Sequence, residues 1–259
     1  MLNALEQFLR EAPLFVFLFA FGIPALIAGG SLFAAFWAWR NARAIASTPA
    51  VRAAAAEPGY RLVEGRLDDK TSTRAPLTGR PCVWWTMKIE ESVRSIDSDR
   101  RSDRRWNLVR ESSSRKPLVL ADGATRITVD PQGAIVYPSA WSEWYGANET
   151  PADRDPALNP GTDTPGGGGR IEVMSDPERR FRYQERYVFA AEPMFALGDV
   201  RAGPRGLAIG KPAGRKPFIL SVRSPSDISA ENGLAVQGGL IVAIVFAGIA
   251  LAVLKLRYG

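Results

Sequence analysis

Side chains that commonly carry out chemistry are scarce in this chain of 259 residues. The sequence contains no histidine and a single cysteine, Cys82. This composition excludes Ser-His and Cys-His nucleophile pairs, imidazole metal ligands, a disulfide within the chain and a cysteine-based zinc site. Metal chemistry would have to use carboxylates, and the sequence predicts neither a metal nor a cofactor.

The carboxylates in strand-like segments are Glu90, Glu91, Asp130, Glu172 and Glu185. Successive strand residues face opposite sides of a sheet, so Glu90 and Glu91 cannot form a catalytic pair by themselves. Glu185 stands among aromatic residues in RYQERYVF, which predicts a partly buried carboxylate bonded to an arginine or to backbone amides. We interpret it as structural, and no catalytic constellation is predicted.

A basic cluster lies in the segment RSIDSDRRSDRRW, where five arginines alternate with three aspartates. The whole chain is also basic, with a formal net charge of +6. Alternating signs at short spacing are typical of a solvated hairpin tip and not of a phosphate-binding patch. We therefore expect no nucleic-acid partner.

Two long uncharged segments dominate the organisation of the chain. No charge occurs in the 28 residues between Glu11 and Arg40 or in the 23 residues between Glu231 and Lys255. Each segment exceeds the roughly 20 residues that a helix needs to cross a bilayer. Tryptophans and arginines border the first, as at a membrane interface. The sequence predicts a membrane protein with two spans, whose termini lie on the same side of the lipid bilayer.

Small residues recur every four positions in the second uncharged segment: Ala235, Gly239, Ala243 and Ala247. Ala25 and Gly29 have the same spacing in the first. On helices such stripes allow close backbone approach, which predicts contact between the spans, a homo-oligomer or a partner membrane protein. An alanine-rich composition explains the pattern equally well.

The sequence between the spans changes to short runs rich in Val, Ile, Trp and Tyr, separated by turn-forming residues, which is typical of consecutive strands. The predicted strands are residues 60–67, 82–93, 106–112, 118–121, 126–130, 134–137, 181–189, 194–200 and 218–222. Two turns stand out, Asp122-Gly123 in LADGAT and Pro131 with Gly133 in VDPQGA. The predicted fold is mainly β, a compact antiparallel sheet, sandwich or partly open barrel between two transmembrane helices.

The predicted organisation is a tail (1–13), a transmembrane helix (14–39), a juxtamembrane helix and linker (40–59), a β domain (60–225), a linker (226–233), a second transmembrane helix (234–254) and a basic tail (255–259). Within the β domain, residues 146–170 lack aromatic side chains and are dense in Pro, Gly, Asp and Thr. Such a segment buries too little apolar surface to offset its ordering entropy, so we predict a flexible insertion.

Five segments, in order, resemble the GIDE/MULAN family: YRLVEGRL, TSTRAPLTGRPCVWWTMKIEE, LVLADGATRITVDPQGA, RYQERYVFAAEPMFALGDV and PFILSVRS. The resemblance covers about residues 15–255. A first motif comprises Ala75, Pro76, Leu77, Gly79, Cys82 and Val83, a second comprises Asp122, Gly123, Val129, Asp130, Pro131, Gly133 and Ala134, and Glu185 lies in the later ER strand. The resemblance implies a domain beside the membrane, the BAM domain, between two helices. In eukaryotic members a C-terminal RING finger makes the protein a mitochondrial E3 ubiquitin ligase.

This chain departs from those relatives in two places. It ends five residues beyond the second span, and with one cysteine and no histidine it cannot build a RING. Ala191, Glu192 and Pro193 stand where a Gly-Asp turn is usual. We predict a RING-less member acting as a non-enzymatic binding or sensing module in membrane stress or organisation. The alternative is an E3 ubiquitin ligase-type activity with a RING supplied by a partner chain.

The motif residues are suited to turns and strand starts, so they specify the fold in one interpretation and line a ligand groove in the other. The side of the membrane that the β domain faces has two opposite predictions. Six basic residues border the spans on the domain side and three on the side of the termini, which favours the cytoplasm. The family resemblance favours the opposite, non-cytoplasmic side.

Overall fold

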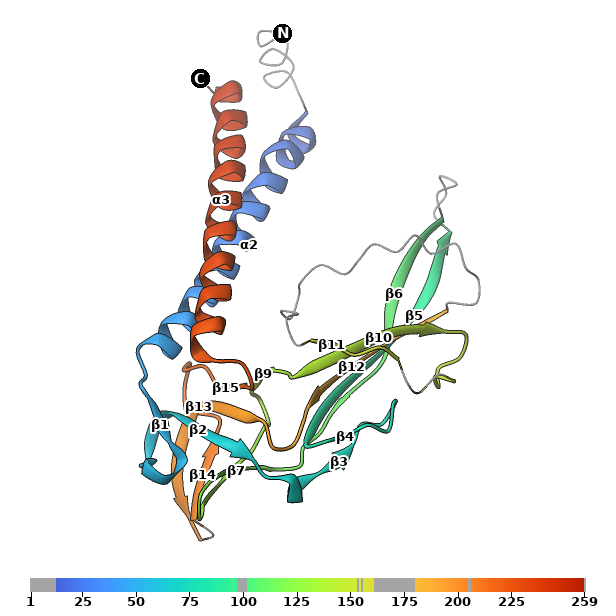
Figure 1. The fold of residues 1–259 in the computed structure, drawn as a ribbon. Helices are drawn as coiled ribbons and strands as arrows, with labels where there is room; N and C mark the ends of the chain where they lie inside the picture. The colour runs from blue at the N-terminus through green and yellow to red at the C-terminus, as the bar shows by residue number, and fades with distance from the viewer. Residues whose placement is uncertain are drawn as a thin grey trace. The chain divides into compact units, whose positions relative to one another are not determined.

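The computed structural model describes residues 13–96, 102–152, 154, 156–160, 180–204 and 206–258 (Figure 1). The chain forms two compact units. The helical unit combines Met1–Ser47 with Pro225–Gly259, and the β unit is Thr48–Ser224.

The helical unit contains two helices, α2 (Leu14–Ala46) and α3 (Pro225–Tyr258). They have 33 and 34 residues, which at ~1.5 Å per residue gives each a length of about 50 Å. The hydrocarbon core of a bilayer is roughly 30 Å thick. Both helices are therefore long and apolar enough to cross a membrane.

The two helices pack antiparallel. The ring of Phe17 in α2 contacts the ring of Tyr258 at the end of α3, with centroids 5.9 Å apart. Further along, a Cβ atom added to Gly239 would lie 3.0 Å from the Cβ of Ala35. The buried positions are Phe17, Ala28, Ala35, Asn41 and Ile45 on α2, and Ile228, Asn232, Ala243 and Ala250 on α3.

The stripe of small residues lies only partly in this contact. Gly239 touches α2 and Ala243 is buried, whereas Ala235 and Ala247 are exposed in the helix pair. The buried alanines on each helix are seven residues apart, because helices that wrap around each other keep a seven-residue repeat in contact. A strict four-residue repeat drifts away from the partner, and Gly29 is likewise exposed.

Both helices extend beyond the predicted spans. Residues 226–233, which we predicted as a linker, form the first turns of α3. Pro225 is suited to a first helical position and Asp227 to a first turn, where the helix dipole favours a negative charge. The predicted juxtamembrane segment 40–59 is helical only to Ala46, and its later residues belong to the β unit.

Five strands of the β unit close into a barrel: β2 (Gly59–Leu67), β7 (Leu118–Asp122), β8 (Thr125–Val129), β14 (Gly206–Gly210) and β13 (Pro193–Gly203). They pair in that order, and β13 returns to β2 in a register from Pro193 opposite Arg66 to Val200 opposite Gly59. Among the neighbouring pairs of these five strands, only β8 and β14 run parallel. This is the Greek-key order of an OB-type barrel. The barrel is closed and not partly open.

Further short elements extend the barrel sheet: β1 (Ala50–Arg52), the 3-10 turn η1 (Ala53–Ala55), β9 (Ile135–Tyr137) and β15 (Ile219–Ser221). Strand β1 lies parallel to β2, β15 pairs with β13, and β9 lies parallel to β15. Ala53 is buried in the barrel core, so the segment after α2 is part of the domain and not a linker.

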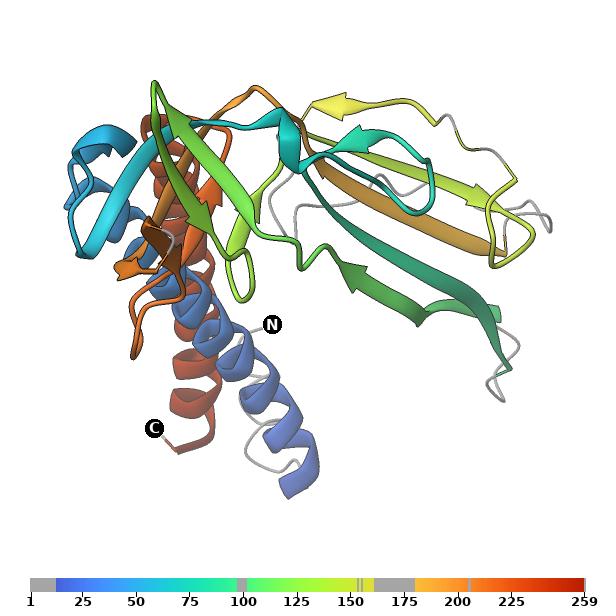
Figure 2. The same cartoon turned by 90° about the horizontal axis from the view of Figure 1, so that it is seen from below.

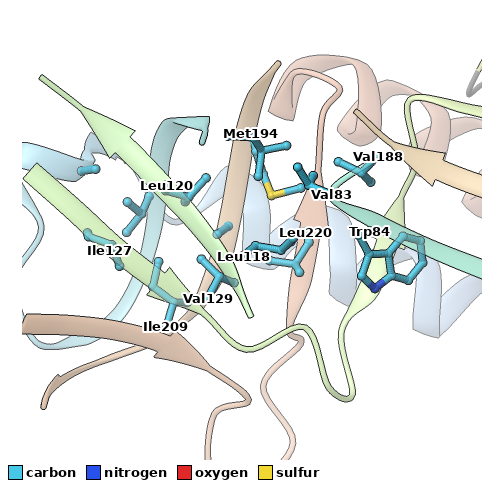
Figure 3. Close-up of a cluster of buried hydrophobic side chains, with 14 of the residues drawn as sticks. Val83, Trp84, Leu118, Leu120, Ile127, Val129, Val188, Met194, Ile209 and Leu220 are labelled. Carbon is cyan, nitrogen blue, oxygen red and sulfur yellow. The ribbon is translucent and has the colours of Figure 1, made fainter. Parts of the chain in front are cut away.

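Alternating side chains fill the barrel, as the period of a half-buried strand requires. Leu118 and Leu120 point inward from β7, and Ile127 and Val129 point inward from β8 (Figure 3). The same cluster contains Val83, Trp84 and Val188, which belong to the chain segments of a second sheet. The two sheets therefore share one apolar core.

The second sheet has five antiparallel strands: β11 (Asn159–Pro160), β10 (Ala140–Gly146), β12 (Phe181–Val188), β5 (Trp84–Ile96) and β6 (Ser102–Ser113). Figure 2 shows it beside the barrel. A register shift between Ile89 and Glu90 marks a bulge. The smaller elements before it are the 3-10 turn η2 (Asp69–Thr71), β3 (Thr73–Arg74) and β4 (Pro81–Cys82). All these segments are insertions into two barrel connections, β2 to β7 and β8 to β13.

All nine predicted strand segments contain strands, so the mainly β prediction is confirmed. The sequence missed β1, β3, β10, β11 and β14, and its predicted strand 82–93 joins Cys82 of β4 to β5. In β10 the aromatic residues lie on both faces and Ser142 points inward, which hides the alternation. Of the predicted flexible insertion 146–170, residues 153, 155 and 161–170 lie outside the described residues. The described part of this segment packs against the second sheet, since Pro151 and Pro156 are buried and β11 pairs with β10.

Candidate functional site

The first motif forms a tight loop between β3 and β4. The Gly79 amide donates to the Ala75 carbonyl at 2.8 Å, and the Ala75 amide donates to the Arg80 carbonyl at 3.0 Å. Gly79 has a φ of +71°, a left-handed angle that favours glycine. The Arg74 guanidinium donates to the Gly79 carbonyl at 2.9 Å, which closes the loop further.

The Glu185 carboxylate fastens this loop to β12. Its side chain is completely buried, and it accepts hydrogen bonds from the amides of Leu77 at 2.9 Å and Thr78 at 3.1 Å. The Thr78 hydroxyl donates at 2.7 Å and the Tyr187 hydroxyl at 3.1 Å. The sequence left open an arginine or backbone amides as partners of Glu185. The structure shows backbone amides, and two hydroxyl groups donate in addition. Four donors satisfy the buried charge, so this carboxylate acts as a clamp.

The groups around Glu185 stay protonated at neutral pH. Burial raises the pKa of Tyr187 to about 12, against the lowering effect of hydrogen bonds with Thr78 and Ser142. Burial, followed by the nearby Glu185 charge, raises the pKa of Cys82 to about 12. The Cys82 side chain is therefore a small buried thiol, which is a poor nucleophile.

Arg80 at the end of the loop holds the segment after β10 against the sheet. Its guanidinium donates to the Pro156 carbonyl and, at 3.5 Å, to the Ser142 hydroxyl. Ser142 in turn donates to the Ala157 carbonyl at 2.9 Å. The motif loop and the segment around residue 156 thus form one cover over this face of the second sheet.

The second motif lies in turns of the barrel. Gly123 and Gly133 have φ angles of +58° and +75°. The Asp122 carboxylate accepts from the Ala54 amide at 3.2 Å, and the Asp130 carboxylate accepts from the Gln132 amide at 3.1 Å. The structure therefore places the second motif in turns of the barrel and the first motif against the second sheet.

A cavity of about 140 Å³ opens beside the clamped loop. Its lining residues are Pro76, Leu77, Met87, Ile89, Arg110, Glu149, Thr150, Pro151 and Arg154. Two of these, Pro76 and Leu77, belong to the first motif, and the others belong to no motif in the sequence. Glu149, Thr150, Pro151 and Arg154 carry no local signal for such a role, because the other lining residues lie far away along the chain, the nearest contact being that of Glu149 with Arg110 at a separation of 39 positions.

A larger and more open hollow of about 470 Å³ lies at the turn of β7 and β8. Its lining includes Arg66, Lys70 and Arg126 together with Asp68, Asp69 and Asp122. A hydrogen bond from the Lys70 amide, then one from Arg126, lowers the pKa of Asp68. The charges balance, so this hollow favours no charge class of ligand.

The opposite face of the second sheet carries an ion cluster. Lys88 contacts Glu90 at 2.6 Å, and the Nε atom of Arg182 donates to Glu90 at 2.7 Å. Burial alone would raise the pKa of Glu90, but the hydrogen bonds from Lys88 and Arg182 lower it overall. Glu91 pairs with Arg180 instead, so the two neighbouring glutamates have separate partners.

Some of the predicted candidates lie outside the described residues. These are Glu172 and the centre of the arginine cluster, residues 97–101. Arg105 is exposed. Within the described ranges, no group of three or more Cys, Asp or Glu side chains could hold a metal ion.

Comparison of the chain with protein-family models, curated proteins and solved structures finds no match. The geometry of the clamped loop and its cavity is therefore the main guide to function.

Proposed function

We propose that this chain is a two-span membrane protein of the GIDE/MULAN type, without a RING, whose β domain is a non-enzymatic binding and sensing module. Its role lies in membrane stress or organisation. The observation that carries the proposal is the clamp on the first motif, where buried Glu185 holds Leu77 and Thr78 beside a cavity. A loop that is fixed before the ligand arrives loses little conformational entropy on binding.

The chemistry around the clamp supports binding and not catalysis. Glu185 has four donors, Cys82 and Tyr187 keep their protons, and Arg80 is engaged with backbone and hydroxyl oxygens. A general base or nucleophile needs a lone pair that is available to the substrate. Here these groups are engaged in holding the loop.

A blocking substitution tests the binding function. Thr150 is exposed at the cavity, so Thr150→Trp covers the opening without entering the core. Ala202→Trp, at an exposed position of β13, is the matched control. In cells lacking the gene, we expect wild type and Ala202→Trp to restore resistance to membrane stress, and Thr150→Trp to fail at equal protein level. Full activity of Thr150→Trp would contradict the proposal.

Membrane anchoring has its own experiment. The two long apolar helices support it, and alkaline carbonate should leave the full chain in the membrane fraction. A single exposed thiol from Ala202→Cys, treated with an impermeant maleimide on intact cells, reports the side of the domain. Buried Cys82 gives little background, which the wild-type chain checks. Release by carbonate would contradict a two-span protein.

A further inference from the structure

The polar side chain of Gln237 interrupts the apolar run of α3. The uncharged segment between Glu231 and Lys255 has 23 residues, and Gln237 is the sixth of them. A helix needs roughly 20 residues to cross the hydrocarbon core, so every spanning window within this segment contains Gln237. An amide at this depth has no water to bind, and an unsatisfied polar group in hydrocarbon is costly.

The Gln237 side chain faces away from α2. Gly239 contacts α2, and Ala243 and Ala250 are buried on the same side of α3. At ~100° per residue, Gln237 lies about 140° around the helix axis from the centre of this group. Its side chain is exposed in the helix pair. The α2 helix therefore does not supply a partner for this amide.

The residues on the same face as Gln237 form a second seam along α3. They follow one another in alternating steps of four and three residues: Gln237, Ile241, Ile244, Gly248 and Leu251. All of them are exposed in the helix pair. A Cβ atom added to Gly248 would meet nothing within 4 Å, so the backbone of another helix can approach there. Such alternating steps are the spacing of a helix that packs along its length against another helix.

Symmetry decides which partner suits this seam. Copies of one chain insert into a membrane in the same orientation, so two α3 helices meet in parallel around a two-fold axis along the membrane normal. Each seam residue then faces its own copy at the same depth. A glutamine amide has both donors and an acceptor, so two opposed Gln237 side chains satisfy each other. The next seam position is Lys255, at the end of the uncharged segment, where a long side chain reaches water.

We propose that this protein forms a parallel dimer through the Gln237 seam of α3, with a second copy of the chain as the partner. The inference rests on the proposed two-span membrane protein and deepens it, because it names the partner within the bilayer. The seam differs from the four-residue stripe of small residues, in which Gly239 contacts α2 and Ala243 is buried.

Cysteine cross-linking maps the seam directly. The full chain carries one new cysteine, and copper phenanthroline oxidises it in isolated membranes. We expect disulfide-linked dimers from Ile241→Cys, Ile244→Cys, Gly248→Cys and Leu251→Cys. The matched controls lie at exposed positions on another side of α3 and should stay monomeric: Gly238→Cys, Val242→Cys and Ile249→Cys. The wild-type chain measures any background from buried Cys82. Equal cross-linking of both sets would overturn the inference.

Variants of Gln237 test the amide itself. Gln237→Leu should weaken dimerisation about three- to twenty-fold, the range for hydrogen bonds between membrane helices. Gln237→Asn keeps a donor and an acceptor and should lose less, and the control Val242→Leu should change nothing. Energy transfer between labelled copies, diluted into lipid vesicles, measures the association. Equal association of Gln237→Leu and wild type would contradict the role of the amide and overturn the inference.

Two further outcomes separate this inference from the proposed function. Cross-links from the seam cysteines to a protein of another mass would mean that a different partner fills the seam, which overturns the dimer. If carbonate leaves the chain in the membrane but the seam cysteines do not cross-link, the dimer is wrong and the two-span protein stands. If carbonate releases the chain, the two-span proposal fails and the dimer with it.

Discussion

The barrel and the second sheet bury their side chains in different ways. Among the described residues, a cluster of sixteen fills the barrel and includes only Val83, Trp84 and Val188 from the segments of the second sheet, whose remaining buried residues form separate clusters of six and four. The second sheet also buries the polar side chains of Glu185, Ser142 and Thr78 and has an exposed edge strand, β6. A closed barrel has no edges and supplies stability. The candidate site therefore lies on the sheet whose buried residues are divided among smaller clusters and include polar side chains.

The largest expected effect is in the barrel. Leu120→Ala should lower the free energy of unfolding by about 2–5 kcal/mol, because it leaves a cavity in a fully buried core. Leu108→Ala, at a side chain of the second sheet that is 54% exposed, should change it by less than about 0.5 kcal/mol. Urea unfolding followed by tryptophan fluorescence measures both. Similar costs would remove the distinction between the regions.

The next largest loss of stability is expected at the Glu185 clamp. Glu185→Gln keeps the shape of the side chain but replaces a charged acceptor for four donors, so we expect a loss of about 2 kcal/mol or more. Hydrogen exchange should accelerate at the Leu77 and Thr78 amides and remain slow at Val129 of the barrel. Glu143→Gln, a half-buried position on the other face of the sheet, is the matched control. Unchanged protection at Leu77 would contradict the clamp.

Two glycines of the barrel give a matched pair with a smaller effect. A Cβ at Gly198 would lie 2.9 Å from the Gly210 carbonyl oxygen, Ile209 and Phe218, whereas a Cβ at Gly210 meets nothing within 4 Å. Gly198→Ala should therefore cost about 1–3 kcal/mol, the usual range for overpacking, and Gly210→Ala much less. Thermal unfolding of the two variants compares them. Equal melting temperatures would show that the barrel wall yields easily.

The smallest effect concerns acid stability of the second sheet. The folded-state pKa of Glu90 lies below its ordinary value of 4.5, so the Lys88 and Arg182 contacts stabilise the fold above that pH. This stabilisation is lost as the pH falls through the lower, folded-state pKa. Unfolding of wild type and Glu90→Gln at pH 7 and below pH 4.5 tests the sign. The difference between them should shrink in acid; a constant difference would contradict it.

Part of the candidate site was accessible from local pattern alone. The aromatic neighbours of Glu185 predicted a buried structural carboxylate, and the turn residues Gly79 and Gly133 predicted turns. Arg110, Thr150 and Arg154 were not accessible, because only the folding of two separate insertions onto one sheet brings them beside Leu77. Long-range placement of this kind leaves no periodic signal near the residues themselves.

Features that depend on neighbours in the chain follow from local sequence. Unbroken apolar runs produce the helices α2 and α3, and alternating branched and aromatic residues produce most strands. The closure of the barrel, in which β14 lies parallel to β8 and β13 returns to β2, depends on tertiary contacts that local sequence does not reveal. The seven-residue contact of the helices and the cavity beside the clamp depend on such contacts as well. The physical reason is that helix and strand formation follows local side-chain periodicity, whereas closure and cavities follow from pairing between segments far apart in sequence.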